Sequence, residues 1–384
     1  MNQPIKNMLR RPIFRLFAAE EPPVLISNHN QLCQVKLNKP KALNSLDLPM
    51  IKILQNALFQ WNSDPEVSAA YFLGAGNKAF CAGGDIRTLY EAKHGSHEPS
   101  VLKDFFWYEY ILDYGLAKMN PVQICEYDGI VMGGGVGISV HAPLRIATEE
   151  AVFAMPETAI GFFPDVGGSY FLSRLPNSLG LYLGVTGARI SGPQLVQAGV
   201  ATHFVPKEKL PELKEYLISE MTSKRTVQEI KDMVEKYSEE ITEPLAELDN
   251  IQRCFSEVTS IEHIYHKLDE DQTEWAEKKL ATFEKLSPLS LKIVFEQVKR
   301  GKELSLEEVF KMEYRLSQNF MNDTDFFEGV RANLVDKDKN PQWKHKSVFE
   351  VPDEEVNKYF EKANSSDKDL EVVEELKLLQ NSNI

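Results

Sequence analysis

A run of glycines in the middle of the chain, GIVMGGGVGISVHA over residues 129–142, joins an apolar stretch that predicts a strand to a stretch that predicts a helix. Glycine lets the backbone approach a ligand closely, and the start of a helix leaves N–H groups free to meet negative charge. The run therefore either cradles a phosphate or stabilises a negative charge that develops during a reaction.

The residues after the glycines argue against a phosphate site. A P-loop places Lys and then Ser or Thr after its last glycine, whereas Gly137 is followed by Ile138 and Ser139. A dinucleotide fingerprint needs a sixth-position glycine early in the chain, and here Ile138 takes that position in mid-chain. The second interpretation is favoured.

A strand-strand-helix order recurs along the first half of the chain. Alternating apolar residues predict strands, and apolar residues at helical spacing predict helices. The predicted elements are a hairpin over 25–40, helices over 45–61, 85–91, 100–116, 133–142 and 191–199, and strands over 69–74, 121–129, 144–148 and 151–155. Asp47 and Ser191 are the expected N-caps of two of these helices, and Gly199 the expected stop of the last.

Four segments are expected. Residues 1–19 form a targeting segment, 20–210 an α/β core, 211–345 a helical region rich in Glu and Lys, and 346–384 a charged tail. The composition of the tail is typical of disorder. The alternative is a short docking helix whose apolar side carries Leu370, Val373 and Leu376.

The first nineteen residues carry four basic residues and no acidic one before Glu20. This composition is typical of a mitochondrial transit peptide, and the alternative is a disordered basic N-terminus. Because the segment holds four positive charges, its removal changes the formal net charge from −14 to −18, which argues against nucleic-acid binding. No apolar run approaches the ~18–20 residues of a membrane span.

Cysteine and histidine spacing predicts no metal site. The four cysteines are far apart and form no CxxC pair, so we expect reduced, mostly buried thiols. His263 and His266 have helical i, i+3 spacing, but no third ligand stands near them in sequence.

A second glycine pair, in FCAGGDIR at residues 80–87, also stands at a predicted helix start, so two loops are available to donate N–H groups to one anion. With it the chain resembles the crotonase superfamily, over about residues 37–206. That resemblance implies a spiral of strand-strand-helix units followed by helices, and an oxyanion hole made by the amides of Gly84 and Gly134. The stretches that carry it are LNKPKALNSL, KAFCAGGDI, MGGGVG, PETAIGFFPDVGG and TGARISGPQLVQAGVATHFVP.

Within the superfamily, the words MGGGVGISVH, FAMPETAIGFFPDVGGSYFL and DFFEGVRANLVDKDKNPQW resemble the branch that hydrolyses 3-hydroxyisobutyryl-CoA in valine breakdown. The resemblance implies a mitochondrial matrix enzyme with a small-molecule acyl-CoA substrate, no cofactor apart from the CoA of that substrate, and no membrane or nucleic-acid partner. Relatives often form trimers, so a homo-oligomer stays an open alternative.

One departure from the superfamily pattern bears on the reaction. Hydratases carry a glutamate two residues after their glycine run, and this chain has Gly137 there. Their other acid is present as Glu157, and Asp165 is an acid that hydratases generally lack. From the residues alone, Glu157 capping a turn and Asp165 starting a helix are equally open.

The resemblance implies a role for each acid. Glu157 attacks the thioester carbonyl or activates water, Asp165 holds the 3-hydroxyl of the substrate, and Glu109 also reaches the substrate. On spacing alone, Glu109 fits a solvated helix face equally well. We expect thiol release and no hydration of crotonyl-CoA, because Gly137 offers no second acid.

The phosphates of coenzyme A need local positive charge on this acidic chain. The basic residues beside the first predicted loops are the candidates: Lys39, Lys41, Lys78 and Arg87. Two rival functions stay open, an enoyl-CoA hydratase or isomerase and a structural subunit of a mitochondrial assembly such as the ribosome.

Overall fold

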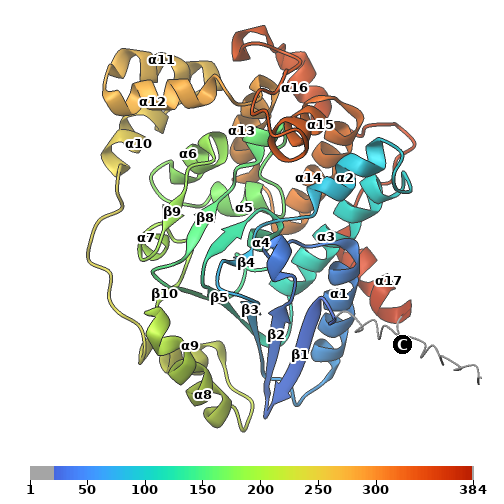
Figure 1. Cartoon of the computed structure of the whole chain (residues 1–384), viewed down its shortest axis with the longest axis vertical. Helices are drawn as coiled ribbons and strands as arrows, with labels where there is room; N and C mark the ends of the chain where they lie inside the picture. The colour runs from blue at the N-terminus through green and yellow to red at the C-terminus, as the bar shows by residue number, and fades with distance from the viewer. Residues whose placement is uncertain (1–20, 383–384) are drawn as a thin grey trace, which may run out of the picture.

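The computed structural model describes residues 21–382, so the predicted transit peptide at 1–19 lies outside the described residues. Two β-sheets occupy the lower and central part of Figure 1, and most of the C-terminal helices gather in its upper part. No helix in the described range has the length and apolar character needed to cross a membrane.

A six-stranded sheet forms the base of the molecule. Its spatial order is β1 (Val24–His29), β2 (Leu32–Leu37), β3 (Ala69–Gly74), β5 (Val122–Tyr127), β7 (Leu144–Ala147) and β10 (His203–Phe204). The first two strands form the expected antiparallel hairpin, and the remaining neighbours are parallel. We call this the large sheet.

A second, four-stranded sheet explains the repeated strand-strand-helix pattern. Its spatial order is β4 (Ala79–Cys81), β6 (Ile130–Met132), β8 (Val152–Ala154) and β9 (Ile190–Ser191). The first strand of each unit lies in the large sheet and the second in this small sheet. Because β4, β6 and β8 are parallel neighbours, their carboxyl ends meet at one edge. Successive units therefore stack as a spiral.

The helices of the core lie between and beside these strands. They are α1 (Leu48–Ser63), α2 (Ile86–Lys93), α3 (Val101–Ala117), α4 (Gly134–Gly137), α5 (Gly168–Leu172), α6 (Leu179–Thr186) and α7 (Gln194–Gln197), with 3₁₀ turns η1 (Pro40–Ala42), η2 (Glu157–Ile160) and η3 (Lys207–Lys209). Asp47 caps α1 as predicted, because its carboxylate accepts the amide of Met50 at 2.9 Å.

Two helix predictions were wrong in extent. The helix expected over 133–142 is the single turn α4, since glycine is a poor helix former and Gly135 packs directly against Cys81 of β4. Ser191 is not a helix cap, because it pairs with Val152 as part of β9. The helix that follows begins only at Gln194.

The C-terminal region is helical, as its composition predicts. It contains α8 (Leu210–Glu220), α9 (Val227–Glu235), α10 (Leu248–Phe255), α11 (Ile261–Asp271), α12 (Glu274–Phe283), α13 (Pro288–Gly301), α14 (Leu306–Asn322), α15 (Asp325–Val330), the π-helical turn η4 (Arg331–Val335), the 3₁₀ turn η5 (Val348–Glu350), α16 (Asp353–Tyr359) and α17 (Val372–Ser382).

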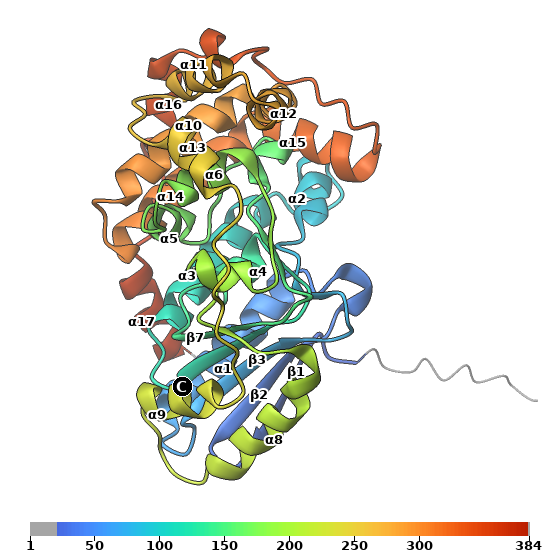
Figure 2. The same ribbon diagram turned by 90° about the vertical axis from the view of Figure 1, so that its left-hand side faces the viewer.

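The large sheet is covered on both faces. Alternate residues of a strand point to opposite faces, and Ala69, Tyr71 and Leu73 of β3 pack with apolar residues of α8 and α9. Ala70 and Phe72 point the other way, into the main core. The two helices lie below the rest of the helical region in Figure 1 and in the view turned by 90° in Figure 2.

The charged tail is ordered over residues 346–382, in agreement with the docking alternative and not with disorder. Of the three apolar residues expected to dock, Leu370 is fully buried, Leu376 packs against the core and Val373 is only half-buried, whereas the adjacent Val372 is fully buried. A Cβ on Gly115 of α3 would lie 3.1 Å from Leu376 Cδ1, so the tail helix α17 lies close against α3. Figure 1 shows α17 beside α1 at the lower right.

Candidate active site

The carboxyl ends of three neighbouring parallel strands bring the predicted site residues together. Gly84 follows β4, Gly134 follows β6, and Glu157 follows β8. Binding sites of parallel sheets lie beyond the carboxyl ends of the strands, because loops from adjacent strands converge there. The small sheet therefore places both glycine loops and one carboxylate at a single edge.

The two glycine loops are in direct contact. A Cβ on Gly134 would lie 3.3 Å from the amide nitrogen of Gly84, and a Cβ on Gly83 would lie 3.9 Å from that of Gly134. Among the described residues, neither the Gly84 nor the Gly134 amide donates a hydrogen bond to a backbone or side-chain acceptor. Both N–H groups are thus free to bind an anion held between the loops.

The side chain of Glu109, on α3, reaches both glycine loops. A Cβ on Gly84 would lie 3.8 Å from Glu109 Oε1, and one on Gly134 would overlap that atom. The side chain is 2% exposed, so the solvated-face interpretation of Glu109 was wrong. Its Oε1 has no hydrogen-bond partner among the described residues.

Glu157 and Asp165 lie on the loop that follows β8. Glu157 begins η2. A Cβ added to Gly133, in the second glycine loop, would lie 3.3 Å from Glu157 Oε1. Asp165 accepts a 2.8 Å hydrogen bond from the hydroxyl of Tyr110, which fixes its carboxylate beside α3. Both acids are 6% exposed and line the same cavity as Glu109.

Position 137 has no room for the acid that hydratases carry. A Cβ on Gly137 would lie 2.6 Å from Asp113 Oδ2 and 2.5 Å from the Cβ of Val166. Asp113 of α3 is fully buried, and neither of its oxygens has a partner among the described residues. The space near position 137 therefore holds a carboxyl group from another helix.

Burial and nearby acidic charge raise the pKa values of the acids in and beside this cavity. Burial raises the pKa of Glu157 and of Glu109 well above their ordinary values, and the charge of Asp165 raises both further. Burial likewise raises the pKa of Asp113, and its acidic neighbours add to the effect. Burial raises the pKa of Asp165 to about 7 even though the Tyr110 hydrogen bond lowers it. Clustered perturbed carboxyl groups in a cavity are typical of an active site.

The cavity at this edge has a volume of about 430 Å³ and is lined by both loops, the three acids, and an apolar wall. That wall includes Phe105, Phe106 and Phe162, of which the last two stack with ring centroids 5.5 Å apart. A short acyl group beside the carboxylates would thus meet aromatic rings. We call this cavity the glycine-loop pocket.

The basic residues expected to bind phosphates are placed unequally. Lys41 and Lys78 are exposed and do not line the glycine-loop pocket, whereas Arg87 donates to the carbonyl of Leu334 at its rim. Arg189 and Lys339 do line the pocket, and the sequence analysis missed both.

Lys39 is not free for a ligand, because it donates to Asp47 Oδ2 at 2.7 Å. Sequence reasoning also missed Asp113, although its i+4 spacing from Glu109 predicts that both acids share one helix face. Lys339 lies within the quoted stretch DFFEGVRANLVDKDKNPQW, but that stretch is far in sequence from the glycine loops, so its place beside them was not recognised.

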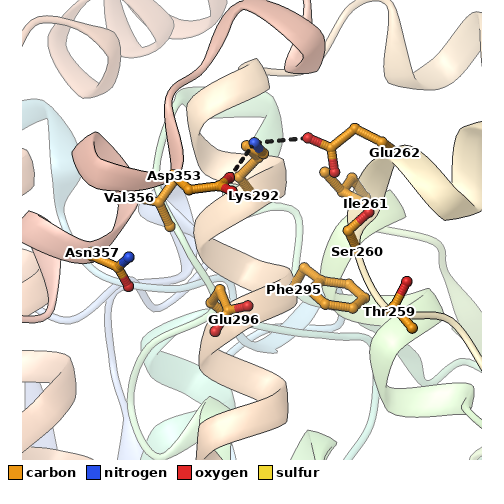
Figure 3. Close-up of a pocket in the computed structure, with 10 residues that line it drawn as sticks. All are labelled: Thr259, Ser260, Ile261, Glu262, Lys292, Phe295, Glu296, Asp353, Val356 and Asn357. Carbon is orange, nitrogen blue, oxygen red and sulfur yellow. Dashed lines mark hydrogen bonds and ion pairs between the residues drawn. The ribbon is translucent and has the colours of Figure 1, made fainter.

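A second cavity of about 440 Å³ lies among the C-terminal helices, as Figure 3 shows. Lys292 of α13 stands in it and donates to Glu262 and Asp353, both at 2.7 Å, and to the carbonyl of Val351 at 2.9 Å. All three protons of the ammonium group are therefore used in joining α11, α13 and α16. We call this cavity the Lys292 pocket.

Comparison with known proteins identifies the family of the chain. A family model described as enoyl-CoA hydratase/isomerase matches residues 32–360. The chain is 46% identical to "3-hydroxyisobutyryl-CoA hydrolase, mitochondrial" of Xenopus tropicalis, over 87% of each chain. The human protein of the same name is 44% identical over 91% of each chain.

Solved structures show the same fold. A carnitinyl-CoA dehydratase of Mycobacterium thermoresistibile superposes with a TM-score of 0.83 at 33% identity, covering 91% of this chain and 98% of that one. An enoyl-CoA hydratase of Rhodobacter sphaeroides superposes with a TM-score of 0.79 at 33% identity, covering 89% and 98%. The predicted crotonase-type α/β fold is confirmed.

Proposed function

Because the chain belongs to the enoyl-CoA hydratase/isomerase family, we propose that it hydrolyses the thioester of 3-hydroxyisobutyryl-CoA to 3-hydroxyisobutyrate and coenzyme A. The observation that carries the proposal is what meets at one edge of the small sheet. The amides of Gly84 and Gly134, which have no acceptor among the described residues, lie there beside the buried carboxyl of Glu157. Gly137 leaves no room for a second hydratase acid.

The free amides of Gly84 and Gly134 bind the thioester oxygen. Attack on the carbonyl carbon places negative charge on that oxygen, and each preorganised donor is typically worth ~3 kcal/mol in the transition state. The close contact of the two loops supports this role, since both donors reach one atom only if their loops lie side by side.

Glu157 acts as a general base or as a nucleophile. As a base it takes a proton from water while the water oxygen attacks the carbonyl; the C–S bond then breaks and the thiolate takes the proton. As a nucleophile it forms an anhydride, the thiolate leaves, and water then hydrolyses the anhydride. Both routes use the ionised carboxylate, and its raised pKa makes it a stronger base.

Asp165 recognises the 3-hydroxyl group. Its pKa, near 7, allows an ionised carboxylate at neutral pH, and Tyr110 directs one of its oxygens. The other oxygen is left to accept a hydrogen bond from the substrate hydroxyl. Glu109, whose Oε1 is unpartnered, lies where it contacts the substrate between the two glycine loops.

Arg189 and Lys339 bind the anionic end of coenzyme A. Both are exposed residues on the lining of the glycine-loop pocket, so their charges lie where a ligand enters. We assign the enzyme to valine breakdown in the mitochondrial matrix. A cytosolic location of a reporter fused to residues 1–30 would contradict that assignment.

A thioester panel tests the activity. We expect free thiol from 3-hydroxyisobutyryl-CoA and no hydration of crotonyl-CoA. Asp165→Asn should lower kcat/KM by ~10–150-fold for the hydroxylated substrate but little for isobutyryl-CoA, because a hydrogen bond to a charged group is worth ~1.5–3 kcal/mol. Rapid hydration without thiol release would identify a hydratase, and no turnover of any thioester by the folded protein would favour the structural subunit.

A further inference from the structure

Glu313, on a helix far from every recognised motif, touches the loop that carries Asp165. It lies on α14, is fully buried, and places one carboxylate oxygen on each of two backbone amides. Oε2 accepts the amide of Gly167 at 2.7 Å, and Oε1 accepts that of Ser169 at 2.8 Å. The two hydrogen bonds fasten the chain two and four residues after Asp165.

The fastened segment has an unfavourable backbone conformation. Val166 has φ = 56° and Gly167 has φ = 82°, so two successive residues after Asp165 are left-handed. A β-branched residue such as valine rarely adopts this conformation, and it persists only where surrounding contacts enforce it. The amide bonds to Glu313 are contacts of that kind.

The other side of Asp165 is fastened from the neighbouring helix. Gln297 of α13 donates to the carbonyl of Pro164 at 2.6 Å, and it too is fully buried. Two buried side chains from the C-terminal helices therefore hold the backbone immediately before and after Asp165. Tyr110 orients the carboxylate itself.

A purely structural role explains Glu313 less well. Burying a carboxyl group is costly unless it is hydrogen-bonded, so an apolar residue would join α14 to α5 at lower cost. Burial raises the pKa of Glu313 to about 8, and its bonds to Ser169 and Gly167 oppose that rise. All its hydrogen-bond partners among the described residues lie in Gly167–Ser169, where the loop after Asp165 enters α5.

We propose that Glu313 is a positioning residue that aligns Asp165 with the 3-hydroxyl group of the substrate. The proposal rests on the proposed function, because it assumes that Asp165 accepts a hydrogen bond from this hydroxyl group. It assigns a part of substrate selection to the C-terminal helices, which lie outside the glycine loops.

The test measures hydroxyl preference, defined as kcat/KM for 3-hydroxyisobutyryl-CoA divided by that for isobutyryl-CoA. Glu313→Gln keeps the volume but turns an amide NH₂ toward a backbone N–H, so we expect the preference to fall ~5-fold or more. Turnover of isobutyryl-CoA should stay within about twofold. Ser317→Ala is the control, because Ser317 is buried one turn along α14 and bonds only within that helix region.

A double variant shows whether Glu313 acts through Asp165. If it does, Glu313→Gln should lower hydroxyl preference no further in an Asp165→Asn background. Gln297→Met, which removes only the bond to Pro164, should give a smaller loss in the same direction and serves if the Glu313 variant does not fold.

The outcomes separate the two proposals. Equal loss on both substrates, an unchanged preference in both loop variants, or additive losses in the double variant would each overturn the positioning role. Absence of thiol release from either substrate by the wild-type protein would instead reject the proposed function.

Discussion

The glycine-loop pocket and the Lys292 pocket have similar volumes, about 430 and 440 Å³, but opposite arrangements of charge. In the Lys292 pocket the lysine stands between two carboxylates. In the glycine-loop pocket, Glu109, Glu157 and Asp165 stand together, and the charge of Asp165 raises the pKa values of the two glutamates beyond the effect of burial. Size therefore does not distinguish the two cavities, whereas the pairing of charges does.

The pKa shifts show what each arrangement favours. Burial raises the pKa of Glu262, but the hydrogen bonds from Lys292, its own backbone and Ser260, together with the charge of Lys292, outweigh burial, so the net shift is downward, toward the charged form. The acids of the glycine-loop pocket shift upward, toward the neutral form. Paired charges join helices, while unpaired buried acids retain the reactivity that a substrate uses.

Glu157→Gln should give the largest difference between the two pockets. The amide keeps the shape but donates no electrons as a carboxylate, so thiol release should fall roughly 10²–10⁴-fold on every thioester. The matched change in the other pocket, Glu262→Gln, should leave kcat within about twofold. Steady-state thiol release measures both, and comparable losses would show that charge pairing does not separate the pockets.

Gly137→Glu tests whether the glycine-loop pocket accepts a hydratase acid. Its Cβ would lie 2.6 Å from Asp113 Oδ2 and 2.5 Å from the Cβ of Val166, and it would add another buried carboxyl. Overpacking alone typically costs ~1–3 kcal/mol, so we expect at least that loss of unfolding free energy and no hydration of crotonyl-CoA. Gly137→Ala isolates the steric part. A stable variant that hydrates crotonyl-CoA would contradict the assignment of position 137.

The sequence predicted the parts of the fold that depend on local pattern. Alternation and helical spacing located β3 and α1 with their bounds nearly correct, and Asp47 caps α1. The residue pattern predicted the recurring strand-strand-helix order, and the resemblance to the crotonase superfamily implied that these units form a spiral. The helix over 133–142 failed because tertiary contact with Cys81 and the run of glycines limit α4 to one turn.

Site residues were predictable where each one belongs to a short motif contained in a single loop. Gly84, Gly134 and Glu157 follow strands of a common sheet, and the structure brings them to one edge. Glu313 was not predictable, because it is 146 residues from the amide of Gly167 to which it bonds. Contacts at such separation leave no local periodicity for the sequence to show.

Lys292→Met should destabilise the protein without changing its catalysis. The variant leaves the carboxylate of Glu262 without its cation, at a site where the lysine side chain is 10% exposed. We therefore expect the free energy of unfolding to fall by about 1–3 kcal/mol. Because the folded pKa of Glu262 is lowered, this stabilisation is present above its unfolded pKa and is lost as pH falls. Urea unfolding at pH 7 and pH 4 measures it. A loss that is the same or greater at pH 4 would contradict the pairing.

Asp113→Asn should change stability with the opposite sign. Burial, then the charges of Glu109, Asp165 and Glu313, raise the folded pKa of Asp113. The folded state thus keeps a proton that the unfolded chain releases near pH 4, and the stability from this group falls as pH rises. The asparagine variant lacks that slope, so between pH 5 and pH 8 it should gain about 1.4 kcal/mol relative to wild type for each pH unit over which folded Asp113 keeps its proton. Asp353→Asn, in the Lys292 pocket, should lose a few tenths of a kcal/mol at pH 8, because its carboxylate is 88% exposed and ion-paired. If Asp113→Asn instead loses stability from pH 5 to pH 8 relative to wild type, Asp113 is ionised in the folded protein, and the acids around Gly137 are not held neutral by one another.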